Sequence, residues 1–232
     1  MKTAIIFLAA IVSAAPAVMA STTTCGNTTL DQYLMPNFTC ISGNLMFSNF
    51  AYSPSANPSG LEIPASSIHV TPITNTLDEG FQFAGGWNVG TQPDGSSAIQ
   101  DSVISFTVST VNGSASLEDL SLYFNGSFSG TGLSSVTEQY CANGDLATCG
   151  AGNSGQIKVA NPPGNFTDPI NFNGVTSISI SKDISVASGI GGTANISQVI
   201  NTFSQIPEPT SCLLLGTGLL GLGLLRRRSL RS

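Results

Sequence analysis

The sequence predicts an all-β protein, an antiparallel β-sandwich of the jelly-roll or immunoglobulin-like kind, and two observations carry this prediction. Apolar and polar residues alternate in short runs, with the period of two that indicates strands buried on one face. Between these runs lie dipeptides that readily adopt the positive φ angles of tight turns. Short alternating strands separated by frequent turns are typical of two packed antiparallel sheets.

The alternation is clearest in three runs, at Val103–Val108, Leu120–Phe124 and Ser177–Ser181. Shorter runs predict further strands at Leu45–Ala51, Ile68–Thr71, Phe81–Phe83, Trp87–Val89, Gln156–Val159 and Ile184–Ala187.

One later segment, Asn195–Phe203, has an ambiguous pattern. Its apolar residues Ile196, Val199, Ile200 and Phe203 have helical spacing, yet Val, Ile, Thr and Phe favour strands. We expect a final strand here.

The connections are expected to be short. Predicted turns contain Pro93-Asp94-Gly95, Asn112-Gly113, Asn125-Gly126, Asn143-Gly144 and Asn173-Gly174. The segment Ala51–Ser59 is rich in Pro, Ser and Asn, and we expect it to be a loop. No repeat or linker divides residues 21–206, a length sufficient for one domain that buries about 70% of its unfolded surface.

The N-terminal end has the features of a secretory signal peptide. Lys2 precedes an apolar run, Ala4–Val12, and small residues at Val18 and Ala20 fit cleavage after Ala20. Cleavage after Ala15 is the alternative, less suitable because Pro16 follows. The sequence therefore predicts export of the domain that begins at Ser21.

The C-terminal end, residues 207–232, combines a polar break, an apolar span and a basic stop. Pro207-Glu208-Pro209 precedes the apolar run Cys212–Leu225, and Arg226-Arg227-Arg228 follow it, an order that stops a segment in a bilayer with its charges in the cytoplasm. As a helix, Ser211–Leu225 would span roughly 22 Å, short of the ~30 Å hydrocarbon core. A short, glycine-rich transmembrane helix suits a transient, cleavable anchor. An ordinary single-pass anchor and a buried core helix are the alternatives.

These residues, with Thr210-Ser211 and the Leu/Gly run Leu213–Leu225, resemble the PEP-CTERM sorting signal of exported bacterial proteins. The resemblance implies that an exosortase, a membrane transpeptidase, cuts the tail near Pro207-Glu208-Pro209, which would then be recognition residues. It also implies a membrane-held precursor and an association with extracellular polysaccharide. Cys212 departs from the small or aliphatic residues usual at its position.

The charge of the exported region excludes one class of partner. Between residues 21 and 206 only Lys158 and Lys182 are basic, against 12 acidic residues, a net charge of −10. Such a region offers no basic surface for a phosphate backbone, so we expect no nucleic-acid binding.

Four cysteines of the exported region form two pairs that are local in sequence. Four cysteines allow three connectivities. We favour Cys25 with Cys40 and Cys141 with Cys149, because each bond would close a loop. Neither spacing matches a common zinc site, so we expect structural disulfides and no metal or cofactor.

Residues suited to catalysis are few. The single histidine, His69, lies between Ile68 and Val70, where an alternating strand would place it on the polar face. Two acid pairs, Asp78-Glu79 and Glu118-Asp119, are adjacent in sequence, but neighbours on a strand point to opposite faces. A glycan hydrolase, which needs two facing carboxylates, is therefore the least favoured function.

Calcium ligands are a further minor alternative for the acids. Asp94 with Asp101, or Asp78 with Glu79, could supply oxygen ligands, but the EF-hand spacing is absent.

The aromatic residues Phe81, Phe83 and Trp87 permit two interpretations. An exposed Trp87 beside Gly85 and Gly86 would form a platform for a sugar ring. We favour the second, in which Trp87 fills the core and its indole N–H finds a partner.

Together these observations predict an exported, non-enzymatic protein of the cell surface or extracellular matrix. A carbohydrate-binding module that retains exopolysaccharide is the alternative.

Overall fold

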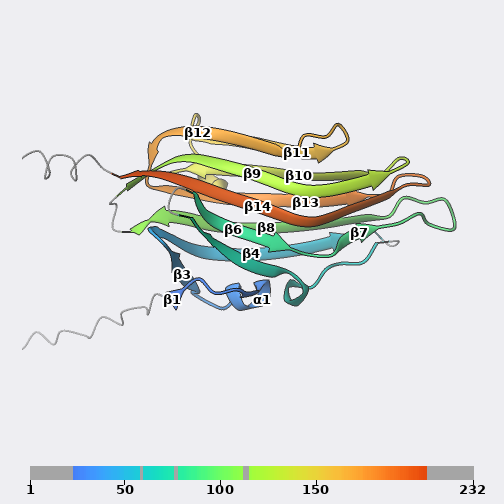
Figure 1. Cartoon of the computed structure of the whole chain (residues 1–232), viewed down its shortest axis with the longest axis horizontal. Coiled ribbons are helices and arrows are strands. Elements are labelled where there is room, and N and C mark those ends of the chain that lie inside the picture. The colour runs from blue at the N-terminus through green and yellow to red at the C-terminus, as the bar shows by residue number, and fades with distance from the viewer. Residues whose placement is uncertain (1–22, 58–59, 76–77, 112–114, 208–232) are drawn as a thin grey trace, which may run out of the picture.

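The computed structural model describes residues 23–57, 60–75, 78–111 and 115–207, and the strands run along the length of the molecule (Figure 1). The predicted signal peptide and most of the predicted sorting tail lie outside these ranges. The predicted two-sheet, all-β architecture is confirmed, with seven strands on each main sheet.

Sheet A has the strand order β1-β3-β4-β8-β13-β10-β11. Its strands are β1 (Thr23–Thr24), β3 (Thr39–Ser42), β4 (Leu45–Ala56), β8 (Ile99–Thr110), β10 (Leu133–Ala142), β11 (Ser154–Asn161) and β13 (Ser177–Ala187).

Sheet B has the order β12-β9-β14-β6-β5-β2, and β7 also pairs with β14. Its strands are β2 (Thr28–Thr29), β5 (His69–Thr74), β6 (Asp78–Ala84), β7 (Trp87–Val89), β9 (Ala115–Ser129), β12 (Thr167–Val175) and β14 (Thr193–Pro207). The described residues also form the short helices α1 (Leu30–Tyr33), η1 (Ala65–Ser67) and η3 (Leu146–Thr148).

Pairing among the described strands is antiparallel except between β1 and β3, which are parallel. The ambiguous segment Asn195–Phe203 lies inside β14, so the expected final strand is confirmed. In β8 and β13 alternate side chains are buried along the whole strand. The buried sides of both sheets form one hydrophobic core.

The prediction of a loop at Ala51–Ser59 was wrong for its first half. Strand β4 continues to Ala56, and Ala51–Ala56 pair with Gln100–Ser105 of β8. Within β4, only Leu45–Ser48 pair with β3, so the rest of β4 lies at the edge of the sheet. An edge strand tolerates Pro54, because the missing N–H would face no partner.

Two predicted turns were also wrong. Asn125-Gly126 lies inside β9 opposite a register shift in β14, and a side chain at Gly126 would collide with the Phe124 ring. Asn173-Gly174 lies inside β12 at another register shift, where Gly174 has a φ of 62°. Gly126 and Gly174 therefore allow irregular pairing between strands and do not reverse the direction of the chain.

Turns do form at two of the other predicted positions. Asn143 begins the turn after β10 with a φ of 52°, and Gly95 has a φ of 74°. Asn112-Gly113 lies outside the described residues.

Both expected disulfides are present. Cys25–Cys40 joins the segment after β1 to β3, with 4.8 Å between the Cα atoms. Cys141–Cys149 joins the end of β10 to the residue after η3, with 5.8 Å between the Cα atoms.

In the part of the chain that the structure describes, no helix has both the length and the apolar character needed to span a membrane.

Candidate functional site

The most unusual feature of the core is a polar cluster between the sheets, formed by Glu138, Lys182 and Asn201 and called here the inter-sheet cluster. Glu138 on β10 and Lys182 on β13 are direct register partners in sheet A. Asn201 lies on β14 of sheet B. All three residues have an exposed fraction of 0%.

Strand alternation explains why these side chains point inward. Lys182 occupies the same face of β13 as Ile178, Ile180, Ile184 and Val186, all of which are buried. Asn201 is likewise in phase with Val199 and Phe203 of β14, and Glu138 with Val136 of β10. Each polar residue therefore replaces an apolar one in an inward row.

The three side chains contact one another directly. Lys182 Nζ lies 3.0 Å from Glu138 Oε2 and also donates a hydrogen bond to Asn201 Oδ1. Asn201 Nδ2 donates to Glu138 Oε1 at 2.9 Å and to Oε2 at 2.8 Å. Each residue of the cluster thus touches the other two.

Aromatic rings surround the lysine. Lys182 Nζ is 4.8 Å from the ring centroid of Phe106 and 5.1 Å from that of Phe83, the distance of cation–π contacts. Burial lowers the pKa of Lys182, and the charge and hydrogen bond of Glu138 oppose that shift. The inter-sheet cluster holds an amine, a carboxylate and a carboxamide together, shielded from water.

This cluster was not predicted from the sequence, although one signal for it was present. Lys182 continues the inward series of Ile178 and Ile180, and it is one of two basic residues in the exported region. A lysine in phase with a buried row needs a buried partner. Which residues would meet it from β10 and β14 could not be read from the pattern of β13.

The proposed ligand platform is contradicted by the structure. Trp87, Phe81 and Phe83 all have an exposed fraction of 0%. Trp87 Nε1 donates to Ser102 Oγ at 3.0 Å, which is the partner expected for a core tryptophan. These three aromatic residues belong to the core and present no ring to a ligand.

The adjacent acids do not form facing pairs. Asp78 is exposed, whereas Glu79 is buried and accepts hydrogen bonds from Asn44 N at 3.1 Å and Gln205 Nε2 at 2.9 Å. Burial raises the pKa of Glu79, which its hydrogen bonds partly oppose. In the second pair, Glu118 is half-buried, and Asp119 accepts hydrogen bonds from the backbone and side chain of Ser204.

The remaining candidates are dispersed. His69 is exposed between buried Ile68 and Val70. Asp94 accepts a hydrogen bond from Ser96 N at 2.9 Å within its turn. On β13, partial burial and the charge of Asp101 raise the pKa of Asp183. Across the described ranges, no three His, Cys, Asp or Glu residues gather in a way that could hold a metal ion.

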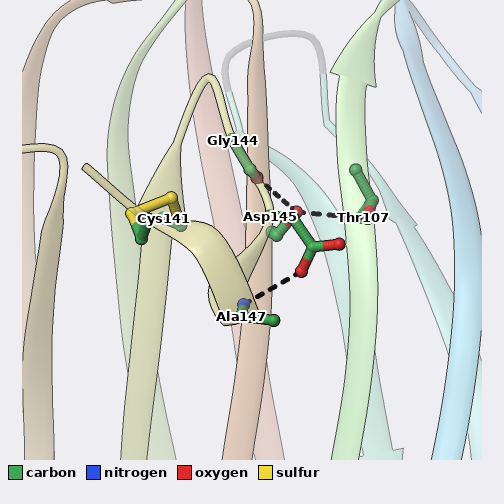
Figure 2. Close-up of a disulfide and its surroundings, with 7 residues drawn as sticks. Thr107, Cys141, Gly144, Asp145 and Ala147 are labelled. Atoms are coloured by element: carbon green, nitrogen blue, oxygen red, sulfur yellow. Dashed lines mark hydrogen bonds between the residues drawn. A yellow bond between two sulfur atoms is a disulfide. The ribbon is translucent and has the colours of Figure 1, made fainter.

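A shallow hollow of about 430 Å³ lies on the outer face of sheet A. Its lining includes Asn49, Thr107, Asp145 and Ser179. Figure 2 shows its surroundings, with Asp145 Oδ1 accepting from Ala147 N at 3.1 Å beside the Cys141–Cys149 disulfide. Ser179 Oγ donates to Gly144 O at 2.8 Å, so β13 holds the turn after β10 in place.

The predicted C-terminal recognition residues begin at the last residue of β14. Pro207 is the last residue of β14 and of the described chain. Glu208, Pro209 and Arg226-Arg227-Arg228 lie outside the described residues.

Comparisons with solved structures found several weak likenesses, three of which are described. TmCBM61 in complex with β-1,4-galactotriose shares 12% identity, with a TM-score of 0.31 over 68% of this chain and 88% of that chain. The Glycosylation Associate Protein (Gap123) complex from Streptococcus agalactiae shares 7% identity, with a TM-score of 0.29 over 66% of this chain and 26% of that chain. The enzymatically active domain of bacteriophage CBA120 tailspike protein 4 shares 14% identity, with a TM-score of 0.28 over 68% and 19%. At these TM-scores the likenesses support no statement about a ligand.

Sequence comparisons gave one family match. No curated protein matches the chain. Residues 205–228 match the model of the PEP-CTERM protein-sorting motif, in agreement with the resemblance of the Pro-Glu-Pro element, apolar run and arginines. The chain therefore carries a PEP-CTERM protein-sorting motif at residues 205–228, which indicates an exported protein that is anchored at the membrane before processing.

Proposed function

We propose that this protein is a non-enzymatic structural component of the cell surface or extracellular matrix, delivered by an exosortase-type transpeptidase that removes the C-terminal tail. The observation that carries the proposal is the position of β14. This 15-residue strand runs directly to Pro207, within the matched motif, and lies between β9 and β6 in sheet B.

An interior strand is a suitable attachment point for a tethered domain. Strand β14 pairs with β9 from Thr193 to Pro207 and with β6 from Val199 to Ser204. A force applied at the C-terminus therefore passes to both neighbouring strands instead of peeling an edge strand away. The disulfides Cys25–Cys40 and Cys141–Cys149 also close two separate loops of the domain covalently.

The absence of an enzymatic role is part of the proposal. Among the described residues, neither adjacent acid pair places two carboxylates across a groove, and His69 is an exposed residue at the start of β5. Incubation of the purified protein with the host exopolysaccharide should release no reducing sugar. Release of reducing sugar would instead support a hydrolase.

The sorting step is tested by intact mass in membrane and matrix fractions of the native host. We expect the membrane fraction to contain the full tail and the matrix fraction to contain protein that ends near residue 207. Glu208→Ala should retain the protein in the membrane fraction with its tail intact. Glu62→Ala, a change of an acid in an exposed loop, is the matched control and should be processed normally. Normal release of Glu208→Ala would contradict the proposed recognition.

Carbohydrate binding is a second candidate, favoured by the hollow on the outer face of sheet A. Hydroxyl and amide groups of Asn49, Thr107 and Ser179 border it, and such groups bind sugar hydroxyls. Affinity electrophoresis in gels that contain the host exopolysaccharide would test this function. Thr107→Val should reduce retardation, whereas Thr137→Val, also half-buried in sheet A but outside that lining, should not. Equal mobility of the wild type with and without polysaccharide would exclude it.

A further inference from the structure

The inter-sheet cluster contains the groups required for an amide exchange reaction. Lys182 carries a primary amine, Asn201 a carboxamide, and Glu138 a carboxylate that contacts both. Sheet A supplies the amine and the carboxylate, and sheet B supplies the carboxamide.

We propose that Lys182 and Asn201 form an intramolecular isopeptide bond, with Glu138 as the catalytic proton carrier. The Lys182 amine attacks Cγ of Asn201, a bond forms between Nζ and Cγ, and the bond between Cγ and Nδ2 breaks. The products are a secondary amide that joins the two side chains and one molecule of ammonia. No oxidant, metal or cofactor is needed, and Glu138 ends in the state in which it began.

The contacts of Glu138 match both proton transfers. Its carboxylate lies 3.0 Å from Lys182 Nζ, close enough to remove a proton from the attacking nitrogen. The same carboxylate receives hydrogen bonds from Asn201 Nδ2 at 2.8 and 2.9 Å, which places the proton beside the nitrogen that leaves. One side chain can therefore take the proton from the nucleophile and deliver it to ammonia.

The surroundings favour reaction over hydrolysis and over a permanent ion pair. A lysine must be neutral to act as a nucleophile, and burial among Phe83 and Phe106 lowers its pKa. The full burial of all three residues excludes the water that would compete as a nucleophile. Two packed sheets also hold the amine and the carboxamide in contact, which removes much of the entropic barrier to reaction.

The location gives the bond a structural consequence. Lys182 and Asn201 are 19 residues apart, on strands of different sheets, and Asn201 lies in the strand that ends at Pro207. The bond would attach the last strand before the sorting motif covalently to sheet A. This chemistry does not depend on the proposed surface function, because it uses residues of the folded domain alone.

Peptide mass spectrometry of the full chain tests the bond. After secretion, the protein is denatured, reduced and cleaved on the N-terminal side of Asp residues. Cleavage before Asp168 and Asp183 puts Lys182 at the end of one peptide and Asn201 in the next, whether or not the tail was removed. We expect one branched product that contains residues 168–182 and the peptide beginning at Asp183, lighter by one ammonia than their sum.

Ammonia loss alone would not be sufficient evidence, because cyclisation of Asn201 onto its own backbone also releases ammonia. Cyclisation leaves two separate peptides, whereas the isopeptide bond joins them. Separate peptides from folded wild-type protein, with Lys182 unmodified, would overturn the proposal.

The role of Glu138 is tested by Glu138→Gln, which preserves the shape of the side chain but removes the proton acceptor. We expect the branched peptide to form at least about a hundredfold more slowly, the lower end of the roughly 10²–10⁴-fold by which general acid–base catalysis accelerates reactions. Glu79→Gln is the matched control, since Glu79 is also buried but its hydrogen bonds come from Asn44 and Gln205 rather than from a lysine. It should retain the branched product.

Folding of each variant is verified by its two disulfides, seen as resistance of four cysteines to alkylation before reduction. If Glu138→Gln does not fold, Asn201→Asp provides a second test, because attack on an aspartic acid would release water and still yield a branched peptide. Undiminished branching in folded Glu138→Gln would remove Glu138 from the mechanism.

Discussion

Lys182 Nζ lies 3.0 Å from Glu138 Oε2, and neither side chain has any exposed surface. Transfer of two charges from water into a protein core costs several kcal/mol for each ion, which their attraction offsets only when the geometry is good and further hydrogen bonds are present. Asn201 supplies those further bonds from the other sheet. The stability of this sandwich therefore depends on the three residues as a unit.

Removal of one partner of the Lys182–Glu138 pair is expected to lower the free energy of unfolding more than removal of both charges. Compared with protein in which the isopeptide bond has not formed, Lys182→Met should leave Glu138 buried without its cation and lower the free energy of unfolding by about 3–5 kcal/mol. Lys182→Met with Glu138→Gln should recover about 2–3 kcal/mol of this loss, since a neutral amide can still bond Asn201. Urea unfolding with intact disulfides measures both. Both variants lack a nucleophilic lysine, so the difference between their stabilities is independent of the isopeptide bond. Equal stabilities would show that a buried Glu138 without Lys182 does not lower the free energy of unfolding.

Trp87 should behave as a core residue. Trp87→Ala should lower the free energy of unfolding by about 3–5 kcal/mol, because it leaves a large cavity. Trp87→Phe should cost less, about 1–2 kcal/mol, since Ser102 Oγ keeps the Tyr52 hydroxyl 3.0 Å away as a partner. Urea unfolding followed by circular dichroism gives both values. A cost within about 0.5 kcal/mol for the alanine variant is the behaviour of a surface residue and would contradict the burial of Trp87.

The two disulfides should contribute similar amounts to stability. In the chain-entropy model, a separation of 15 residues for Cys25–Cys40 corresponds to about 3 kcal/mol. The separation of 8 residues for Cys141–Cys149 corresponds to about 2.5 kcal/mol. Paired Cys→Ser substitutions, one pair at a time, would be compared by urea unfolding. A loss below about 0.5 kcal/mol for either pair would show that its loop is already ordered in the unfolded chain.

Two acids should affect stability in opposite directions with pH. Partial burial and the charge of Asp101 raise the pKa of Asp183, so its ionised form costs stability above the folded-state pKa. Asp183→Asn should therefore raise the melting temperature at pH 7. The gain should shrink as the pH falls through the folded-state pKa and disappear below the unfolded pKa of about 3.8, where wild-type Asp183 is protonated in both states.

Asp94 provides the comparison of opposite sign. Hydrogen bonds from Ser96 lower the pKa of Asp94, so its carboxylate contributes stability above the unfolded pKa and loses it as the pH falls through the folded pKa. Asp94→Asn should lower the melting temperature at pH 7, and this loss should shrink in acid. Melting scans from pH 7 to pH 3 follow both variants; shifts of the same sign would contradict the assigned environments.

Local patterns were sufficient for most of the secondary structure. The period of two identifies inward positions because it depends only on the pleat of each strand, and β8 and β13 follow it without interruption. The same reasoning failed at Ala51–Ala56 and at Asn125-Gly126. Pro, Ser, Asn and Gly are also compatible with an edge strand and with a bulge, and neither feature can be recognised before the neighbouring strands are known.

The sequence by itself was sufficient to recognise the sorting motif and to predict the all-β class and both disulfides, because each depends on residues close together in the chain. Only the tertiary structure decided that Trp87 is buried and that Glu138, Lys182 and Asn201 meet. Glu138 and Asn201 are 63 residues apart and lie on different sheets. Their contact depends on strand order, register and the packing of one sheet on the other. These features are determined by contacts throughout the core, between residues far apart in the chain.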